Sequence, residues 1–409
     1  MNRPQTKTKT ILIGTSLRDL PVQRHFAALG RELVNAGYPV TLIAYGPVEK
    51  TLEVDPRVSV LNWPSARPTH LADMLFFDRL VRRVRPCCLI SNFGARNIMM
   101  ISGGLRRVPV RIHWHHTLSS QSESDWSDSH WKLDLLKLRA RIPFGFATHV
   151  VANSNAARQD VIEVFGVPAR KCQVFWNALE DPWSQLAPAS ASKAGSCDFR
   201  PFICVGRLAA SKGQDVLLKS MAQLAARHPA ATVEFIGDGA TRVACEEMAR
   251  KFGLGERCRF WGLLPHPEVL SRMAGALAVV VPSRFEAFGL VNIESMSVGV
   301  PVIGSNTGGI AEIVRDGVDG FLFPPEDHDA LAARMMILLE NKPLRAQMAA
   351  NARHRFLEHF ESTRVVKEQA RWIIEQVGKA VNGILQGGGA IRGAGAAAVS
   401  NPLHGGPCP

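Results

Sequence analysis

The segment RFEAFGLVNIESMSVGVPVIGSNTGG (residues 284–309) places two glutamates, Glu286 and Glu294, eight residues apart among apolar or small residues. Its pattern predicts a strand at 277–281, a turn that contains Glu286, and a helix that begins near Gly289 and contains Glu294. The first amides of a helix have no intrahelical acceptor, so they can bind a phosphate or a hydroxyl group. Here those amides belong to Ala287, Phe288, Gly289 and Leu290.

The two carboxylates could bind a polyol that lies against this turn. Carboxylate oxygens accept hydrogen bonds from hydroxyl groups, so a ribose or a hexose would suit Glu286 and Glu294. Gly289 would let such a ligand approach the backbone closely. The alternative is that Glu286 only adds a favourable charge near a helix N-terminus, and that Glu294 is an ordinary surface residue.

Two cations follow another predicted strand. In CVGRLAASKGQDVLLKSM (204–221), Arg207 comes directly after Gly206, and Lys212 begins a predicted helix five residues later. Both could face one diphosphate, which Arg207 would bind as a fork and Lys212 as a point charge. The alternative is that both are solvated loop cations.

Two more segments contain glycine turns, IGDGA (236–240), at the end of a predicted strand, and FWGLL (260–264). The backbone around Gly262 and Leu263 could receive a flat base. Each turn indicates little by itself, because glycine ends many strands.

Three histidines lie at the end of the apolar run PVRIHW (109–114), as His113, His115 and His116. A neutral imidazole at this position could orient a sugar or a hydroxyl group. The alternatives are packing in the core and a metal site. We expect no metal, because no suitably spaced Asp, Glu or Cys partner is evident.

Short apolar runs alternate with helical patterns along the chain, which favours parallel sheets covered on both faces. The alternation breaks at 181–200, a stretch rich in Pro, Ser and Ala that is typical of a linker. The runs lie at 10–14, 39–45, 58–63, 87–91, 109–114 and 148–153, and then at 202–206, 232–237, 277–282, 301–304 and 320–323.

The chain is therefore expected to form an α/β protein with two domains, 1–180 and 201–360, joined by the linker. A last helix is predicted at 361–385, with an apolar stripe at Val366, Ala370, Ile373, Val377 and Val381. The Gly- and Ala-rich tail 386–409 is expected to be disordered.

In this order, the motifs resemble the donor-binding domain of retaining, sugar-nucleotide-dependent glycosyltransferases. That family is the large group 1 family, or glycosyltransferase family 4, of the GT-B fold. Its hallmark is Glu-x7-Glu, here Glu286 to Glu294, followed by a Gly-Pro segment and a Gly-Gly loop, here SVGVPVIGSNTGG. The GRL…KG…LL segment matches as well. The resemblance is strong over 198–325 and weak over 10–180.

The resemblance implies two doubly wound Rossmann-like domains that face a cleft, with the final helix crossing back onto the first domain. Arg207 and Lys212 would hold the donor diphosphate, and Glu294 would bind the nucleotide ribose. Glu286 and the turn amides would hold hydroxyl groups of the transferred sugar. The Gly308–Gly309 loop and Glu312 belong to the same pattern, although Glu312 could be structural.

On the acceptor side, a histidine near the strand end lies beside the reacting sugar in this family. His116 matches it best, and His115 is the second choice. The implied function is a retaining, metal-independent transfer of a hexosyl unit from a UDP- or GDP-sugar to a saccharide or lipid-linked acceptor. The nucleotide diphosphate sugar is a co-substrate, and no cofactor is implied. The alternatives are a GT-B sugar-nucleotide epimerase and a non-catalytic sugar-nucleotide-binding protein.

The acceptor half departs from the family pattern in two places. The first loop, IGTSLRDLP, contains only Gly14 where the family has a glycine pair. FWNALE retains Asn177 but has Ala178 in place of the usual glycine. The identity of the acceptor therefore stays open.

The net charge is +12 and the pI is about 9.6, which suggests an anionic ligand or surface. The basic helix predicted at 131–144 could lie on an anionic membrane or turn its apolar stripe to the core, and we favour the core. No motif supports nucleic-acid binding. The N-terminal apolar run is too short for a signal peptide, and no apolar run is long enough to span a bilayer. We therefore expect a cytoplasmic protein, with the inner membrane face as an alternative location.

Overall fold

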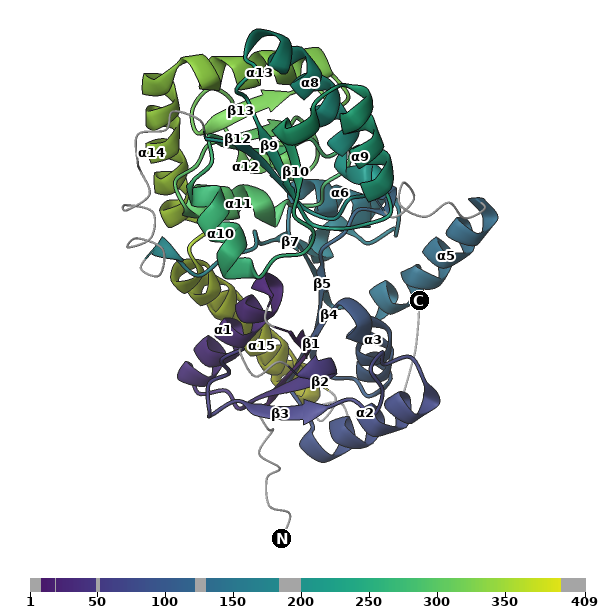
Figure 1. The fold of residues 1–409 in the computed structure, drawn as a ribbon. Coiled ribbons are helices and arrows are strands. Elements are labelled where there is room, and N and C mark those ends of the chain that lie inside the picture. The colour runs from purple at the N-terminus through teal and green to yellow at the C-terminus, as the bar shows by residue number, and fades with distance from the viewer. Residues whose placement is uncertain (1–8, 19, 49–51, 122–129, 184–199, 391–409) are drawn as a thin grey trace, which may run out of the picture.

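The computed structural model describes residues 9–18, 20–48, 52–121, 130–183 and 200–390, without the side chains of 47–48, 130–137 and 383–390. They form two parallel sheets in separate domains, which Figure 1 shows with the second domain, in green, above the first, in purple and blue. The two sheets, each wound with helices, confirm the predicted α/β, GT-B-like arrangement.

The first sheet has seven strands in the order β3-β2-β1-β4-β5-β6-β7. Its strands are β1 (Ile11–Leu17), β2 (Val40–Val48), β3 (Ser59–Asn62), β4 (Cys88–Asn92), β5 (Val110–His115), β6 (His149–Ala152) and β7 (Cys172–Val174). Its helices are α1 (Pro21–Asn35), α2 (Leu71–Val84), α3 (Arg96–Leu105), α5 (His130–Phe146) and α6 (Asn155–Glu163).

The second sheet has six strands in the order β10-β9-β8-β11-β12-β13. Its strands are β8 (Phe202–Val205), β9 (Val233–Ile236), β10 (Cys258–Phe260), β11 (Ala278–Val281), β12 (Val302–Ser305) and β13 (Gly320–Phe323). The helices of this half are α8 (Gln214–Arg227), α9 (Arg242–Lys251), α10 (His266–Ala274), α11 (Leu290–Ser297), α12 (Ile310–Ile313), α13 (His328–Glu340), α14 (Lys342–His359) and α15 (Ser362–Ala390).

Every predicted strand overlaps a strand of the structure, because buried parallel strands are continuous apolar runs that the sequence displays directly. Two strands were not predicted, β7 and β10. Each spans only three residues and alternates half-buried with exposed side chains, so neither carries such a run. In the first sheet, the strand order reverses between β1 and β4, as it does in a doubly wound sheet.

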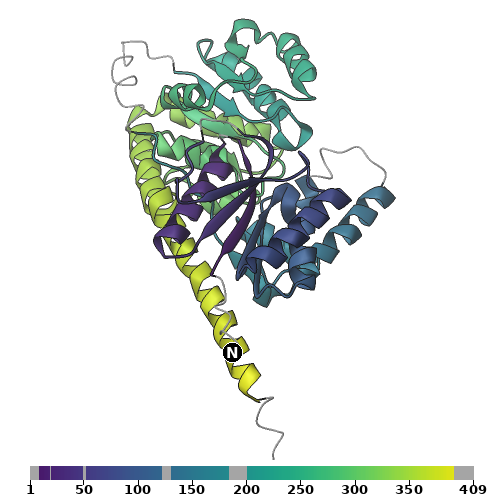
Figure 2. The ribbon, with the colours of Figure 1, turned by 90° about the horizontal axis from the view of Figure 1, so that it is seen from below.

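Helix α15 returns to the first domain after the second is complete. Its side chains Val366, Ala370, Ile373 and Val377 are buried in the core beneath β1 and α1. Figure 2 shows α15, in yellow, running beside the first domain. Leu179 fixes the crossing, because its amide donates to Phe360 O (3.0 Å) and its carbonyl accepts from Ser362 N (2.8 Å).

Two predicted boundaries need comment. The backbone of 386–390 continues α15, although its glycines suggested that the helix ends at 385; extending an existing helix adds one hydrogen bond per residue, so weak helix formers can follow a docked segment. Residues 391–409 and 184–199, most of the predicted tail and linker, lie outside the described residues.

Part of the apolar stripe of helix α5 does not face the core, as we had expected it to. Leu138 and Ile142, two members of its predicted apolar stripe, are 58% and 56% exposed, so the core-facing arrangement is wrong for this part of the helix. Phe144, near its end, provides the buried contact instead. Among the described residues, no helix is long and apolar enough to cross a membrane.

The docking of α15 can be tested with Ile373→Ala. Ile373 is fully buried, so its truncation is expected to lower the free energy of unfolding by about 2–5 kcal/mol. Urea unfolding followed by tryptophan fluorescence would measure it. Lys379→Ala is the control, because that exposed side chain makes only an ion pair with Glu375 on the same helix, worth under about 1 kcal/mol. Equal stability of the two variants would contradict the docking.

Candidate functional site

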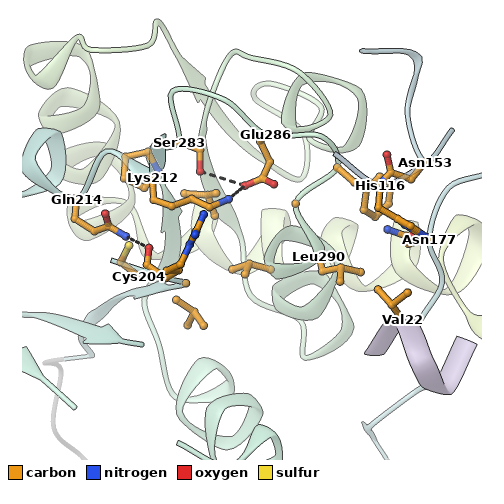
Figure 3. A pocket seen from close by; sticks show the side chains of 18 of the residues that line it. Val22, His116, Asn153, Asn177, Cys204, Lys212, Gln214, Ser283, Glu286 and Leu290 are labelled. Carbon is orange, nitrogen blue, oxygen red and sulfur yellow. Dashed lines mark hydrogen bonds and ion pairs between the residues drawn. The ribbon is translucent and has the colours of Figure 1, made fainter. Parts of the chain in front are cut away.

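A cavity of about 300 Å³ lies where the carboxyl ends of the two sheets face each other. Both domains line it, and Figure 3 shows their side chains meeting across it. The second domain contributes Gly206, Arg207, Lys212, Gln214, Ser283, Glu286, Phe288, Gly289 and Leu290, and the first contributes Val22, Phe93, His116, Asn153 and Asn177. The structure thus brings the predicted cation pair, the Glu286 turn and His116 to one place.

The turn after β11 holds Glu286 from several directions. Its carboxylate accepts from Lys212 Nζ at 2.7 Å and from Ser283 Oγ at 3.2 Å. Its backbone carbonyl accepts from Gly309 N at 2.9 Å. Gly308 has φ +47°, and a Cβ there would lie 2.1 Å from Glu286 O, so the Gly-Gly loop packs backbone against backbone. These glycines are required by the close approach.

Lys212 does not begin the helix, as predicted, but ends a short 3₁₀ turn, Ala210–Lys212. Gly213 follows with φ +64° and caps α8; a Cβ on it would lie 2.1 Å from Pro282 O. Only glycine allows the loop after β8 to lie so close to the loop after β11. This close approach places Lys212 beside Glu286. Arg207 is exposed at the cavity wall, and its carbonyl accepts from Gln214 Nε2 at 3.0 Å.

Arg284 fixes the same two loops to each other. Its guanidinium donates to both carboxylate oxygens of Asp215, at 2.9 and 2.8 Å, and it also pairs with Glu326. Burial alone would raise the pKa of Asp215, but the hydrogen bonds and charge of Arg284 lower it below its usual value. The hydrogen bond with Asp215 in turn raises the pKa of Arg284. The ion pairs of Arg284 with Asp215 and Glu326 were not predicted from the sequence, because these residues are far apart in the chain.

Glu294 lies apart from Glu286. It is 6% exposed, and its Oε1 lies 3.0 Å from His266 Nε2. Both line a second cavity of about 130 Å³, whose other wall includes Arg24 and His25 of α1. The histidine partner was not predicted.

Gly262 and Leu263 do not line the cavity with Glu286. Gly262 has φ +71° and its carbonyl accepts from Gly237 N at 2.8 Å. Leu263 is 82% exposed. The predicted base position is therefore an open turn beside β10.

The three histidines at the end of β5 separate. His113 Nδ1 lies 3.1 Å from Ser91 Oγ, and His115 Nε2 lies 3.9 Å from Asp160 Oδ2, away from the cavity. His116 alone lines the cavity. Burial lowers the pKa of His116 to about 3, so its ring is neutral near pH 7. Neither ring nitrogen of His116 has a hydrogen-bond partner among the described residues.

The two domains touch directly beside the Glu286 turn. Ser154 Oγ donates to Ala287 O, and Ser154 also caps α6 by accepting from Ala157 N at 2.9 Å. Glu312 accepts from the amides of Asn155 and Ala156, each at 2.9 Å. Glu312 thus serves as a carboxylate at the N-terminus of a helix in the other domain, where negative charge is favourable.

Two lining residues that the sequence analysis missed, Phe93 and Asn153, come directly after β4 and β6. Their position was a usable signal, since residues at the carboxyl ends of parallel strands line ligand sites in such sheets. Within the described parts of the chain, no three His, Cys, Asp or Glu side chains form a group that could hold a metal ion.

Comparison with known proteins gives two family matches. Residues 196–355 match the model for glycosyl transferases group 1, and residues 22–181 match the model for Glycosyltransferase Family 4. Each match falls on one domain of the structure.

Similar curated proteins include a synthase and a glycosyltransferase by name. A glycogen synthase of Mycobacterium tuberculosis is 30% identical over 52% of this chain and 50% of its own length. A D-inositol 3-phosphate glycosyltransferase of Thermobispora bispora is 30% identical over 50% of this chain and 51% of its own. The chain thus spans about half the length of the curated relatives it matches.

Solved structures resemble the whole fold. Sucrose-phosphate synthase from Thermosynechococcus elongatus has a TM-score of 0.74 at 20% identity, over 90% of this chain and 98% of its own. Anabaena HepE, in complex with UDP and glucose, has a TM-score of 0.71 at 20% identity, over 90% and 99%. With both domains matched by their family models, the chain belongs to the group 1 glycosyltransferases of the GT-B fold.

Proposed function

We propose that the protein is a retaining glycosyltransferase that moves a hexosyl unit from a nucleoside diphosphate sugar to an acceptor hydroxyl, without a metal ion. The observation that carries the proposal is the cavity itself, where Arg207, Lys212 and the Glu286 turn of one domain face His116 of the other. The two curated relatives described above, a glycogen synthase and a glycosyltransferase by name, do not favour the alternatives of an epimerase or a non-catalytic binding protein.

The donor diphosphate is assigned to Arg207 and Lys212. Lys212 is already held by Glu286 at 2.7 Å, so little side-chain freedom remains to be lost when an anion binds. Glu286 and the amides of Ala287–Leu290 would then hold the hydroxyl groups of the transferred sugar. The UDP and glucose bound to Anabaena HepE support a nucleotide-sugar donor, with UDP or GDP as the nucleotide.

The ribose is assigned to Glu294 and the base to the backbone at Gly262 and Leu263. Glu294 would have to share its carboxylate between His266 and a ribose hydroxyl, which its second oxygen allows. The exposure of Leu263 leaves the turn open to a flat ligand.

The transfer itself needs no protein nucleophile. As the bond between the sugar and the diphosphate breaks, the leaving phosphate takes the proton of the acceptor hydroxyl, and the acceptor oxygen bonds to the sugar on the same face. Arg207 and Lys212 stabilise the charge that develops on the diphosphate, an electrostatic contribution. His116 is neutral and has no hydrogen-bond partner among the described residues, so its ring can accept from or donate to a sugar hydroxyl.

The acceptor is proposed to be a saccharide or a lipid-linked saccharide. Leu138 and Ile142 on α5 are exposed beside Arg139 and Arg141, which supports contact of this helix with an anionic membrane surface. Such contact would bring a lipid-linked acceptor to the cleft.

The proposal is tested by binding and then by transfer. A thermal-shift panel of UDP, GDP, ADP and their hexose conjugates should show one nucleotide raising the melting temperature, because a ligand of the native state stabilises it. Transfer from the matching sugar should then proceed in EDTA, with the anomeric configuration retained when the product is examined by NMR. No shift with any nucleotide at millimolar concentration would contradict the assigned donor site.

Arg207→Ala and Lys212→Ala are each expected to lower kcat by about 100- to 1,000-fold, as loss of one donor to a developing oxyanion does. Initial rates of nucleotide diphosphate release would measure this. Lys219→Ala provides a cation on α8 that does not line the cavity, and its rate should stay near that of the unchanged protein. Near-normal kcat in both Arg207→Ala and Lys212→Ala would contradict the assignment of the donor diphosphate to these residues.

The neutrality of His116 predicts a pH dependence of stability. Its pKa is 6.5 in the unfolded chain and about 3 in the fold, so between these values the unfolded state binds more protons. Stability is therefore lost as the pH falls from about 6.5 towards 3. The free energy of unfolding of His116→Gln, measured by urea titration from pH 7 to pH 4, should decrease less steeply than that of the unchanged protein. His354→Gln, at an exposed position, is the control, and equal slopes for all three would refute the prediction.

A further inference from the structure

Phe93 lines the cavity in an unusual backbone conformation. Its φ is +43°, in the left-handed region that bulky side chains rarely adopt. The side chain is nevertheless 44% exposed at the mouth of the cleft. Strained residues of this kind gather at functional sites, where the surrounding structure holds them. A strained backbone that presents an exposed aromatic ring at a cavity is therefore a candidate for ligand contact.

The ring of Phe93 is fixed by the histidine of the site. It stacks on His116 with centroids 4.7 Å apart and planes inclined by 22°. His116 in turn meets Phe26 of α1 edge to face, with centroids 6.2 Å apart. The position of Phe93 is thus set by packing that extends into the core of the first domain.

The wall that the first domain contributes carries no charge among its described residues. It consists of Val22, Phe93, His116, Asn153 and Asn177. Burial keeps His116 neutral, as its low pKa indicates. Asn153 is 2% exposed, and its Oδ1 has no hydrogen-bond partner among the described residues. Every charged lining residue, Arg207, Lys212 and Glu286, belongs to the second domain.

We propose that Phe93 is a specificity-determining platform on which the acceptor, an uncharged saccharide, stacks the C–H face of a sugar ring. This proposal rests on the proposed transferase function and names its acceptor class. A sugar ring combines an apolar face with hydroxyl edges, so it matches an aromatic ring flanked by uncharged hydrogen-bonding groups. Asn153 Oδ1 and the ring of His116 are the partners available to its hydroxyl groups.

A phosphorylated acceptor fits this wall poorly. Phosphate groups are recognised by arginine, lysine or helix N-termini, and burying an anion without them is costly. The two cations in the cavity stand on the opposite wall, beside Glu286, where the donor diphosphate is assigned. The proposed acceptor therefore differs from the D-inositol 3-phosphate that appears in the name of one curated relative.

The test compares transfer to neutral and to phosphorylated acceptors. The probes are methyl and octyl glycosides of glucose, galactose, mannose and N-acetylglucosamine, the matching sugar 6-phosphates, and inositol 3-phosphate. At least one neutral glycoside should be glycosylated, with kcat/KM at least about tenfold above that of any phosphorylated probe. Preference for a phosphorylated probe, or no transfer to any neutral glycoside while the donor is hydrolysed, would overturn the proposal.

Variants of Phe93 then identify the ring as the cause. Phe93→Gly relaxes the backbone at φ +43° while removing the ring, so it separates strain from stacking. Both Phe93→Gly and Phe93→Ala should lower kcat/KM for the neutral acceptor by about tenfold or more, as loss of one aromatic stacking partner does, and Phe93→Trp should restore it. Phe252→Ala removes an exposed phenylalanine outside the cavity and should change nothing.

The donor readouts keep this test separate from that of the proposed function. The melting shift with nucleotide should be the same in the Phe93 variants as in the unchanged protein, because the nucleotide is assigned to residues of the second domain. Unchanged acceptor kcat/KM in Phe93→Gly and Phe93→Ala would refute the platform and leave the transferase standing. Absence of both nucleotide binding and donor hydrolysis in the unchanged protein would instead remove the transferase proposal, and the platform with it.

Discussion

The backbone of the Glu286 turn is the point on which the rest of the site depends. Gly309 donates to Glu286 O from one side, and Ser154 of the other domain donates to Ala287 O. With these carbonyls engaged, the following amides stand at the start of α11, where the helix gives them no acceptor. The ion pair of Lys212 with Glu286 fixes the side chain over the same turn. The Glu286 carboxylate thus joins the loop after β8 to the turn after β11, and the Glu286 carbonyl joins the loop after β12 to it. The Ala287 carbonyl joins the first domain to the same turn.

The same turn couples the two domains. Ser154 and Glu312 connect the N-terminus of α6 to the Ala287 turn and to α12, so the first domain is fastened to the loops that surround the cavity. At the opposite side, α15 returns to the first domain after a backbone crossing at Leu179. Among the described residues, the domains are therefore joined on one side by the polar contacts of Ser154 and Glu312, and on the other by the backbone bonds of Leu179 where the chain returns to the first domain.

The sequence predicted most of the fold and the charged wall of the cavity, for one physical reason. In a doubly wound sheet, residues that directly follow strands converge at one edge, which is consistent with the grouping of Arg207, Lys212 and Glu286 that the family resemblance implied. Phe93 and Asn153 obey the same rule, yet neither carries a charge or a motif that marked it. The pairing of Glu294 with His266 could not be foreseen, because it joins residues that only the packing of α10 against α11 brings together. The exposure of Leu138 likewise depends on what α5 packs against, which periodicity does not contain.

The two walls of the cavity differ in how their polar groups are paired. The second domain keeps its charges paired, so that Lys212 and Glu286 are each satisfied before any ligand arrives. In the first domain, the ring nitrogens of His116 and the Asn153 side-chain oxygen are buried and have no hydrogen-bond partner in the part of the chain that the structure describes, which costs stability. Folded proteins satisfy nearly all of their buried polar groups, so a cluster of exceptions at one wall marks a place where a ligand or water completes the bonds. Aromatic packing, not hydrogen bonding, fixes the orientation of the His116 ring. Phe93 stacks on its face, and Phe26 meets it edge to face. The ring can then be rigid while both of its nitrogens stay available, which an orienting side chain for a neutral hydroxyl needs.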